Sequence, residues 1–193
     1  MDLLSRLARL GLVAMAAVAL GSPQPADGQG LTQDEALRAA FPQADSVVRR
    51  TAYLDDDQLA QARSLAGSEV PVESGVVTHY LAFQAGRATG VAYFDAHRVR
   101  TFPEVLMVVV GPDARIRRVE VVRFSEPPEY LAPGGWLGQF TDRGLDPELS
   151  HKRGIANITG ATLTARAATA AARRVLALHR VIAPLGPASG GEG

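Results

Sequence analysis

The chain has 193 residues, of which 47% are hydrophobic and 21% charged, as in one folded globular domain. Its 20 basic and 20 acidic residues give a formal net charge of zero, which argues against a nucleic-acid partner. It has no cysteine, which excludes disulfides, thiolate metal sites and iron–sulfur clusters. Any redox chemistry would therefore need an organic cofactor or a metal held by other ligands.

The first residues have the pattern of an export signal. Arg6 and Arg9 precede an apolar run from residue 10 to 20, and a stretch rich in Gly, Ser, Pro and Ala follows. That run is short for a membrane span. We expect residues 1–28 to be a signal peptide or an N-terminal anchor. The protein would then be extracytoplasmic, in the periplasm or at the outer face of the inner membrane.

Two helices are predicted next. Thr32 and Glu35 fit a capping box, which predicts a short helix to about Ala40. Three aspartates at 55–57 precede a second helical stretch, residues 58–65, and acidic side chains are favourable at a helix N-terminus. Helix capping therefore accounts for these aspartates better than a metal site does.

The middle of the chain predicts strands. Residues 76–83 and 91–94 flank a turn-rich segment at 85–90, which indicates a hairpin, and residues 105–110 and 116–124 form a second pair. The run 105–110 does not alternate, so we place it in the centre of the sheet with both faces covered. The expected fold is α+β: a twisted, mainly antiparallel sheet with flanking helices, in a single domain at 31–182.

The C-terminal third contains a long loop and then a long helix. The loop, about 125–150, is rich in Pro and Gly with isolated aromatics, and loops of this length inside a compact domain are usually functional. A helical pattern runs from Thr164 to about Arg180, and Pro184 marks its end. The Gly- and Ser-rich segment 183–193 is expected to be a disordered tail.

The helix is preceded by a tetrapeptide, Thr159–Thr162, of small residues. Unpaired backbone N–H groups and the positive end of the helix dipole make such a start suitable for a phosphate. Gly160 gives the backbone conformational freedom near a ligand. The hydroxyl of Thr162 could either cap the helix or be esterified.

This segment resembles the S/T-G-A-T signature of the FMN-binding domain family, which includes FMN-carrying subunits of the sodium-pumping NADH:quinone reductase and of the Rnf complex. The resemblance implies that Thr162 bears FMN through a phosphoester, added by a flavin transferase that uses FAD. The neighbouring cofactor-binding residues would be Thr159, Gly160, Ala161, Leu163 and Thr164. Many members carry an aspartate three residues before the signature, where this chain has Ala156. Non-covalent FMN, or no FMN at all, is the alternative.

The loop before the motif could complete the pocket. The stretch around Glu126 loosely resembles a Glu-Thr-Pro-Gly segment of the family. An isoalloxazine ring needs an apolar or aromatic wall, which Tyr130 and Trp136 could form, and polar groups at its edge, such as Glu126 and Gln139. Alternatively, the two aromatic residues anchor the loop to the core.

Three functions follow from these observations. The first is an electron-transfer relay that carries FMN and has a flavin transferase and membrane or periplasmic redox partners. The second is a small flavin-dependent reductase, and the third is a non-redox envelope binding module in which Thr162 only caps a helix. No general acid is evident beside the motif, which favours an electron carrier over a stand-alone catalyst. The four histidines are too dispersed to predict a metal site.

Overall fold

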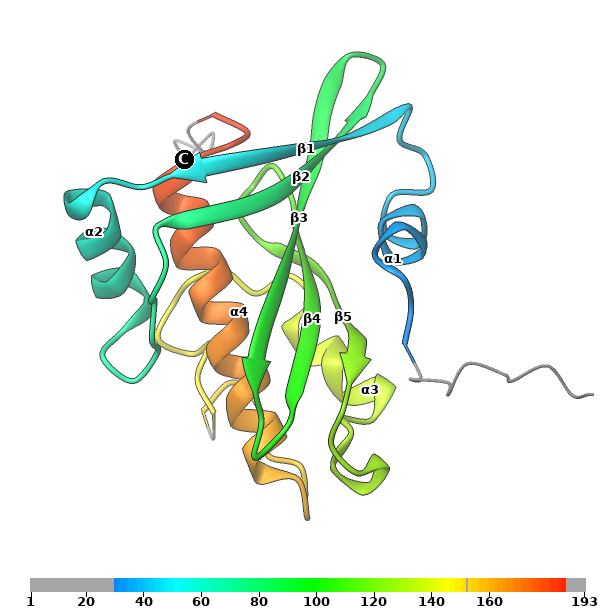
Figure 1. Cartoon of the computed structure of the whole chain (residues 1–193), viewed down its shortest axis with the longest axis vertical. Coiled ribbons are helices and arrows are strands. Elements are labelled where there is room, and N and C mark those ends of the chain that lie inside the picture. Colours follow the sequence, from blue (N-terminus) through cyan, green and yellow to red (C-terminus); the bar gives the residue numbers. More distant parts are fainter. Residues whose placement is uncertain (1–29, 152, 187–193) are drawn as a thin grey trace, which may run out of the picture.

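The computed structural model describes residues 30–151 and 153–186. Five strands form one antiparallel sheet in the order β1-β2-β3-β4-β5 (Figure 1). Their bounds are β1 Ser46–Tyr53, β2 Val76–Gln84, β3 Arg87–Arg98, β4 Pro103–Val110 and β5 Ile116–Phe124. With the helices described below, this confirms the α+β prediction. The predicted export signal at 1–28 and most of the predicted tail lie outside the described residues.

Both predicted N-terminal helices are present with capping boxes. In α1 (Gln33–Ala40), the Thr32 side chain accepts from the backbone N–H of Glu35, whose carboxylate accepts from Thr32 in return. The second helix, α2 (Asp56–Ala66), starts two residues before the predicted residue 58. The reason is that Asp55, the first of the three aspartates, is itself the N-cap and accepts from the backbone of Gln58.

The β2-β3 hairpin is longer than predicted. Its turn consists of Ala85 and Gly86, with φ of 49° and 75°, rather than the whole segment 85–90. The left-handed conformation at both positions suits the twist of a tight hairpin. Strand β3 therefore begins at Arg87 and continues past the predicted residue 94 to Arg98.

An edge strand precedes the predicted ones. β1 pairs with β2 in continuous register from Ser46↔Phe83 to Tyr53↔Val76, and most of its residues are exposed. The strand has no buried apolar face, so it lacks the alternation from which a strand is predicted. Its backbone hydrogen bonds to β2 hold it in place.

The sheet is covered on both faces at β4. Residues 106–110 of β4 are all buried, as predicted for a strand covered on two sides, although β4 is the fourth of five strands and not the middle one. The long helix α4 (Thr162–Ile182) packs on one face, with α2 beside it, and α1 packs on the other (Figure 1). Small buried residues such as Ala168 and Ala172 let α4 lie close to the sheet.

The loop between β5 and α4 contains short helical turns: η1 (Pro128–Tyr130), α3 (Gly134–Leu137) and η2 (Gly138–Phe140). Phe140 and Leu149 are fully buried, so the loop contributes to the core that α4 shares with the sheet. Among the helices that the structure describes, none combines the length and apolarity needed to cross a membrane.

Candidate functional site

The tetrapeptide lies at the start of α4, as predicted, but Thr162 does not cap the helix. The N-cap residue is Ala161, whose side chain cannot accept a hydrogen bond, and Thr162 occupies the first helical position. The interpretation of Thr162 as a capping residue is therefore wrong. Because no side chain caps this end, the N–H groups of the first turn are available for an anion, and the helix dipole favours a negative charge there.

Gly160 sets the direction in which the chain enters α4. Its φ is +84°, in the left-handed region that other residues rarely adopt. A Cβ at this position would meet no heavy atom within 4 Å, so the backbone conformation, not crowding, is what requires glycine. Ala161 then turns its methyl group inward and is buried, which leaves the next residue, Thr162, at the surface of the motif.

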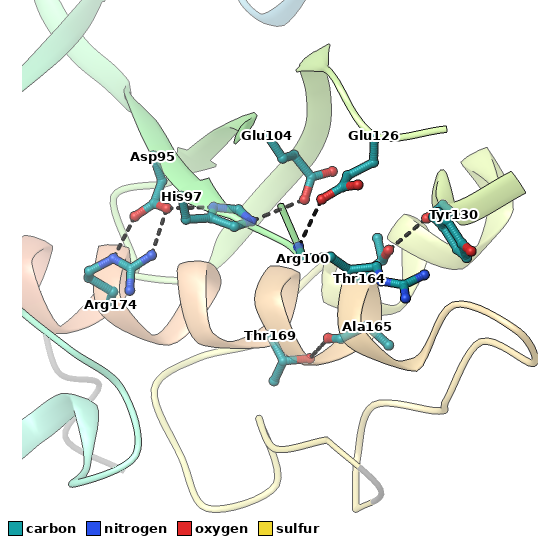
Figure 2. Close-up of polar contacts among 10 residues, drawn as sticks. All are labelled: Asp95, His97, Arg100, Glu104, Glu126, Tyr130, Thr164, Ala165, Thr169 and Arg174. Carbon is teal, nitrogen blue, oxygen red and sulfur yellow. Dashed lines mark hydrogen bonds and ion pairs between the residues drawn. The ribbon is translucent and has the colours of Figure 1, made fainter. Parts of the chain in front are cut away.

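The three threonines of this segment have different environments. Thr164 is 1% exposed, and its hydroxyl donates to the carbonyl oxygen of Tyr130 at 2.6 Å (Figure 2). Thr159 is exposed and lines no described cavity, whereas Thr162 is half-buried and opens into one. Burial and an existing hydrogen bond make Thr164 a poor acceptor for a modification, so the geometry favours Thr162.

The cavity beside Thr162 has a volume of about 480 Å³. This lies within the range of roughly 300–1,000 Å³ typical of small-molecule sites. One wall is the face of α4, and the others come from the segment after α2, the β3-β4 hairpin and the loop before the motif. The principal lining residues are Val70, Val99, His151, Leu163, Arg166 and Ala170.

Basic side chains predominate around this cavity. Arg173 is held by three carbonyl oxygens, those of Ala66 at 2.9 Å, Asp146 at 2.8 Å and Leu149 at 3.0 Å. Neutral carbonyl groups, rather than a carboxylate, thus hold the Arg173 guanidinium in place. Arg166 is exposed and lies four residues after Thr162, on the same face of the helix. Among the described residues that line the cavity, Glu69 is the one acidic residue, so the cavity suits an anionic ligand.

A hydrogen-bond chain leads to the Thr162 hydroxyl from the preceding loop. The Nδ2 atom of Asn157 donates to Oγ1 of Thr162 at 3.1 Å, and Nε2 of His151 lies 3.0 Å from Oδ1 of Asn157. The sequence pattern singled out neither residue, since His151 is one of four dispersed histidines and Asn157 lies outside the tetrapeptide. No spacing rule signals such a contact, because it depends on the fold of the loop between them.

The other predicted pocket residues lie outside this cavity and support the loops around the motif. Trp136 donates through Nε1 to the carbonyl oxygen of Ala156 at 2.8 Å, and Gln139 accepts from the Ala156 backbone N–H at 2.9 Å. The guanidinium carbon of Arg100 lies over the ring of Tyr130, 4.6 Å from the ring centroid. These contacts match the alternative in which the aromatic residues anchor the loop. A contact between these side chains and a cofactor stays a prediction.

Glu126 organises the β3-β4 hairpin. One oxygen of its buried carboxylate accepts backbone N–H groups from Arg100 at 2.9 Å, Thr101 at 2.6 Å and Phe102 at 2.8 Å. These hydrogen bonds, led by that from Phe102, outweigh desolvation and lower the pKa of Glu126. The carboxylate therefore stays ionised and fixes the hairpin next to Val99, a residue that lines the cavity.

A buried ionic cluster joins the sheet to α4 (Figure 2). His97 lies between two carboxylates, 2.9 Å from Asp95 and 3.0 Å from Glu104, and Arg174 on α4 binds Asp95. Burial alone would lower the pKa of His97, but hydrogen bonds to Asp95 and Glu104 raise it to about 9. Burial would raise the pKa of Asp95, yet bonds from His97 and Arg174 bring it to about 2. The described residues include no group of three or more His, Asp or Glu side chains arranged so that they could hold a metal ion.

Comparison with known families gives a match over this part of the chain. Residues 103–177, which run from β4 into the last part of α4 and include the tetrapeptide, match the family described as the FMN-binding domain. The resemblance expected from the tetrapeptide is thereby confirmed for residues 103–177. The match supports flavin binding by the chain, with FMN as the cofactor. No curated protein matches the chain.

Proposed function

We propose that the chain carries FMN covalently on Thr162, through a phosphoester, and serves as an extracytoplasmic electron-transfer relay. The observation that carries this proposal is the position of Thr162. This residue ends the family's tetrapeptide, starts a helix that no side chain caps, and opens into a cavity of ligand size. The cofactor, when bound, supplies the capacity to accept electrons from one partner and pass them to another.

The residues around Thr162 fit such a group. The first-turn N–H groups of α4 and the Arg166 guanidinium would neutralise the phosphate, which keeps a negative charge after esterification. The apolar parts of the wall, from Val70, Val99 and Ala170, would contact the ring system and keep water from it. Carbonyl oxygens hold the Arg173 guanidinium in place, so its positive charge would stay near the ring system. That charge would stabilise the electron-rich form of the ring relative to the electron-poor form.

A covalent bond suits an exported protein, because such a protein cannot replace lost FMN from a cytoplasmic pool. The expected partners are a flavin transferase and redox proteins of the membrane or periplasm. The export pattern in the first 28 residues supports this location.

The proposal is tested by co-expressing the full chain with a flavin transferase and examining it by denaturing electrophoresis. We expect in-gel flavin fluorescence in the wild type and in the control variant Gln61→Ala, an exposed change on α2, and none in Thr162→Ala. Absence of fluorescence in the wild type would overturn covalent attachment, and fluorescence that persists in Thr162→Ala would place it elsewhere. Turnover of the labelled protein with diffusible acceptors at enzymatic rates would favour the small reductase over the relay.

A further inference from the structure

The Thr162 hydroxyl is held by a residue of the preceding loop that lies outside the tetrapeptide. Thr162 does not use its oxygen to cap α4, and that oxygen instead accepts from Nδ2 of Asn157 at 3.1 Å. The bond uses one lone pair of the oxygen and restricts rotation about the Cα–Cβ bond of Thr162. The hydroxyl group thus has a defined direction at the mouth of the cavity.

Asn157 is itself oriented by His151. The Oδ1 atom of Asn157 can only accept, so Nε2 of His151, 3.0 Å away, donates to it. In this arrangement Nδ2 of Asn157 faces Thr162 and Oδ1 faces His151, and the arrangement requires the His151 tautomer that is protonated at Nε2. The three side chains therefore form one directed chain: His151 to Asn157 to Thr162.

The loop that carries His151 and Asn157 is tightly constrained. The backbone N–H of Gly154 donates to the carbonyl oxygen of Glu148 at 3.0 Å, and the Gly154 carbonyl accepts from Arg143 at 2.8 Å. A side chain at position 154 would collide with that Glu148 oxygen. Ile155 is fully buried and bridges back to His151 in a short β-bridge. The loop is thus built to return Asn157 to the helix start.

We propose that Asn157, oriented by His151, is a positioning residue that holds the Thr162 hydroxyl for esterification. This inference rests on the proposed function. In the reaction, Oγ1 of Thr162 forms a bond to the phosphorus of the FMN half of FAD, and the pyrophosphate bond breaks. AMP leaves, and the hydroxyl proton passes to a base of the transferase or to water. A pre-oriented hydroxyl reduces the rotational freedom that must be lost at this step.

After esterification, Oγ1 becomes a bridging ester oxygen and a weaker acceptor. The Asn157 amide is then free to donate to a non-bridging phosphate oxygen, so the same residue would also bind the product. His151 and Arg166 line the same cavity and add positive or hydrogen-bonding groups near that phosphate.

The test measures initial rates of covalent labelling of the purified full chain by a flavin transferase and FAD, over a range of chain concentrations. Asn157→Ala removes the whole side chain, and Asn157→Asp keeps its size and its contact to His151 but removes the N–H donor. Gln61→Ala, an exposed change on α2, is the control. We expect both Asn157 variants to lose about tenfold in kcat with little change in KM, because a positioning bond acts on the reacting step.

His151→Ala should lose less, about threefold, because the amide remains but can turn. Thermal unfolding of each variant checks that the fold is intact. If the wild type labels and Asn157→Asp labels at the wild-type kcat, the donor role is overturned while the proposed function stands. If the change appears only in KM, Asn157 is a docking contact and the inference is also overturned. If the wild type does not label at all, both proposals fail.

Discussion

Arg174 and Asp95 form a two-pronged ion pair, with Nε to Oδ2 and Nη2 to Oδ1 both at 2.7 Å, that ties α4 to β3. Both side chains are mostly buried, and Asp95 also binds His97. Removing one partner of a buried pair leaves an uncompensated charge. We expect Asp95→Asn to lower the free energy of unfolding by about 3 kcal/mol in urea titrations. In the more exposed Arg118–Glu120 pair, Glu120→Gln should cost at most about 1 kcal/mol. Equal effects in the two variants would contradict this account.

Stability should fall on the alkaline side because of His97. Its pKa is raised from 6.5 to about 9 in the folded chain, so folding favours the protonated form. The resulting stabilisation is fully present below pH 6.5 and is lost as the pH rises through about 9. Urea titrations between about pH 6 and pH 10 should show a loss of roughly 2–3 kcal/mol. His97→Gln should be less stable at neutral pH and show a flatter profile; an unchanged alkaline slope would assign the effect to another group.

The Thr164 hydroxyl should stabilise the junction between the loop and α4. Thr164→Val keeps the shape of the side chain but leaves the carbonyl oxygen of Tyr130 without this donor. We expect a loss of about 1–2 kcal/mol in the free energy of unfolding. Thr169→Val is the matched control, because the Thr169 hydroxyl donates to a carbonyl inside its own helix, that of Ala165 (Figure 2). A larger loss in Thr169→Val than in Thr164→Val would contradict this account.

Trp136 should hold the chain just before the tetrapeptide. Trp136→Phe keeps an aromatic ring against Phe140, which it meets edge-on with centroids 5.4 Å apart, and removes the N–H bond to the Ala156 carbonyl. We expect a cost of about 1 kcal/mol and faster amide hydrogen exchange in the segment 154–160. Unchanged exchange there would show that the Gln139 contact alone holds the segment.

Features with a local cause were predictable from the sequence. The capping box of α1, the aspartates at the start of α2 and the apolar run of β4 each lie in a few consecutive residues whose chemistry specifies the structure. The helical pattern predicts a start at Thr164, two residues after the observed start of α4 at Thr162. The tetrapeptide was found because it is contiguous.

Features that depend on distant partners were not predictable. Strand β1 is stabilised by pairing with β2, so its own residues carry no alternation. The cluster around His97 unites β3, β4 and α4, and Asn157 meets Thr162 only because Gly154 lets the loop turn back. In each case the chemistry is set by residues that the fold brings together.

Peptide mapping tests the central claim most directly. Trypsin cleaves after Arg153 and Arg166, so a single peptide, residues 154–166, contains Thr159, Thr162 and Thr164. After co-expression with a flavin transferase, this peptide should gain the mass of FMN less one water, and fragmentation should place the whole increment on Thr162. An unmodified peptide, or an increment on Thr159 or Thr164, would contradict the assignment of Thr162 as the attachment site.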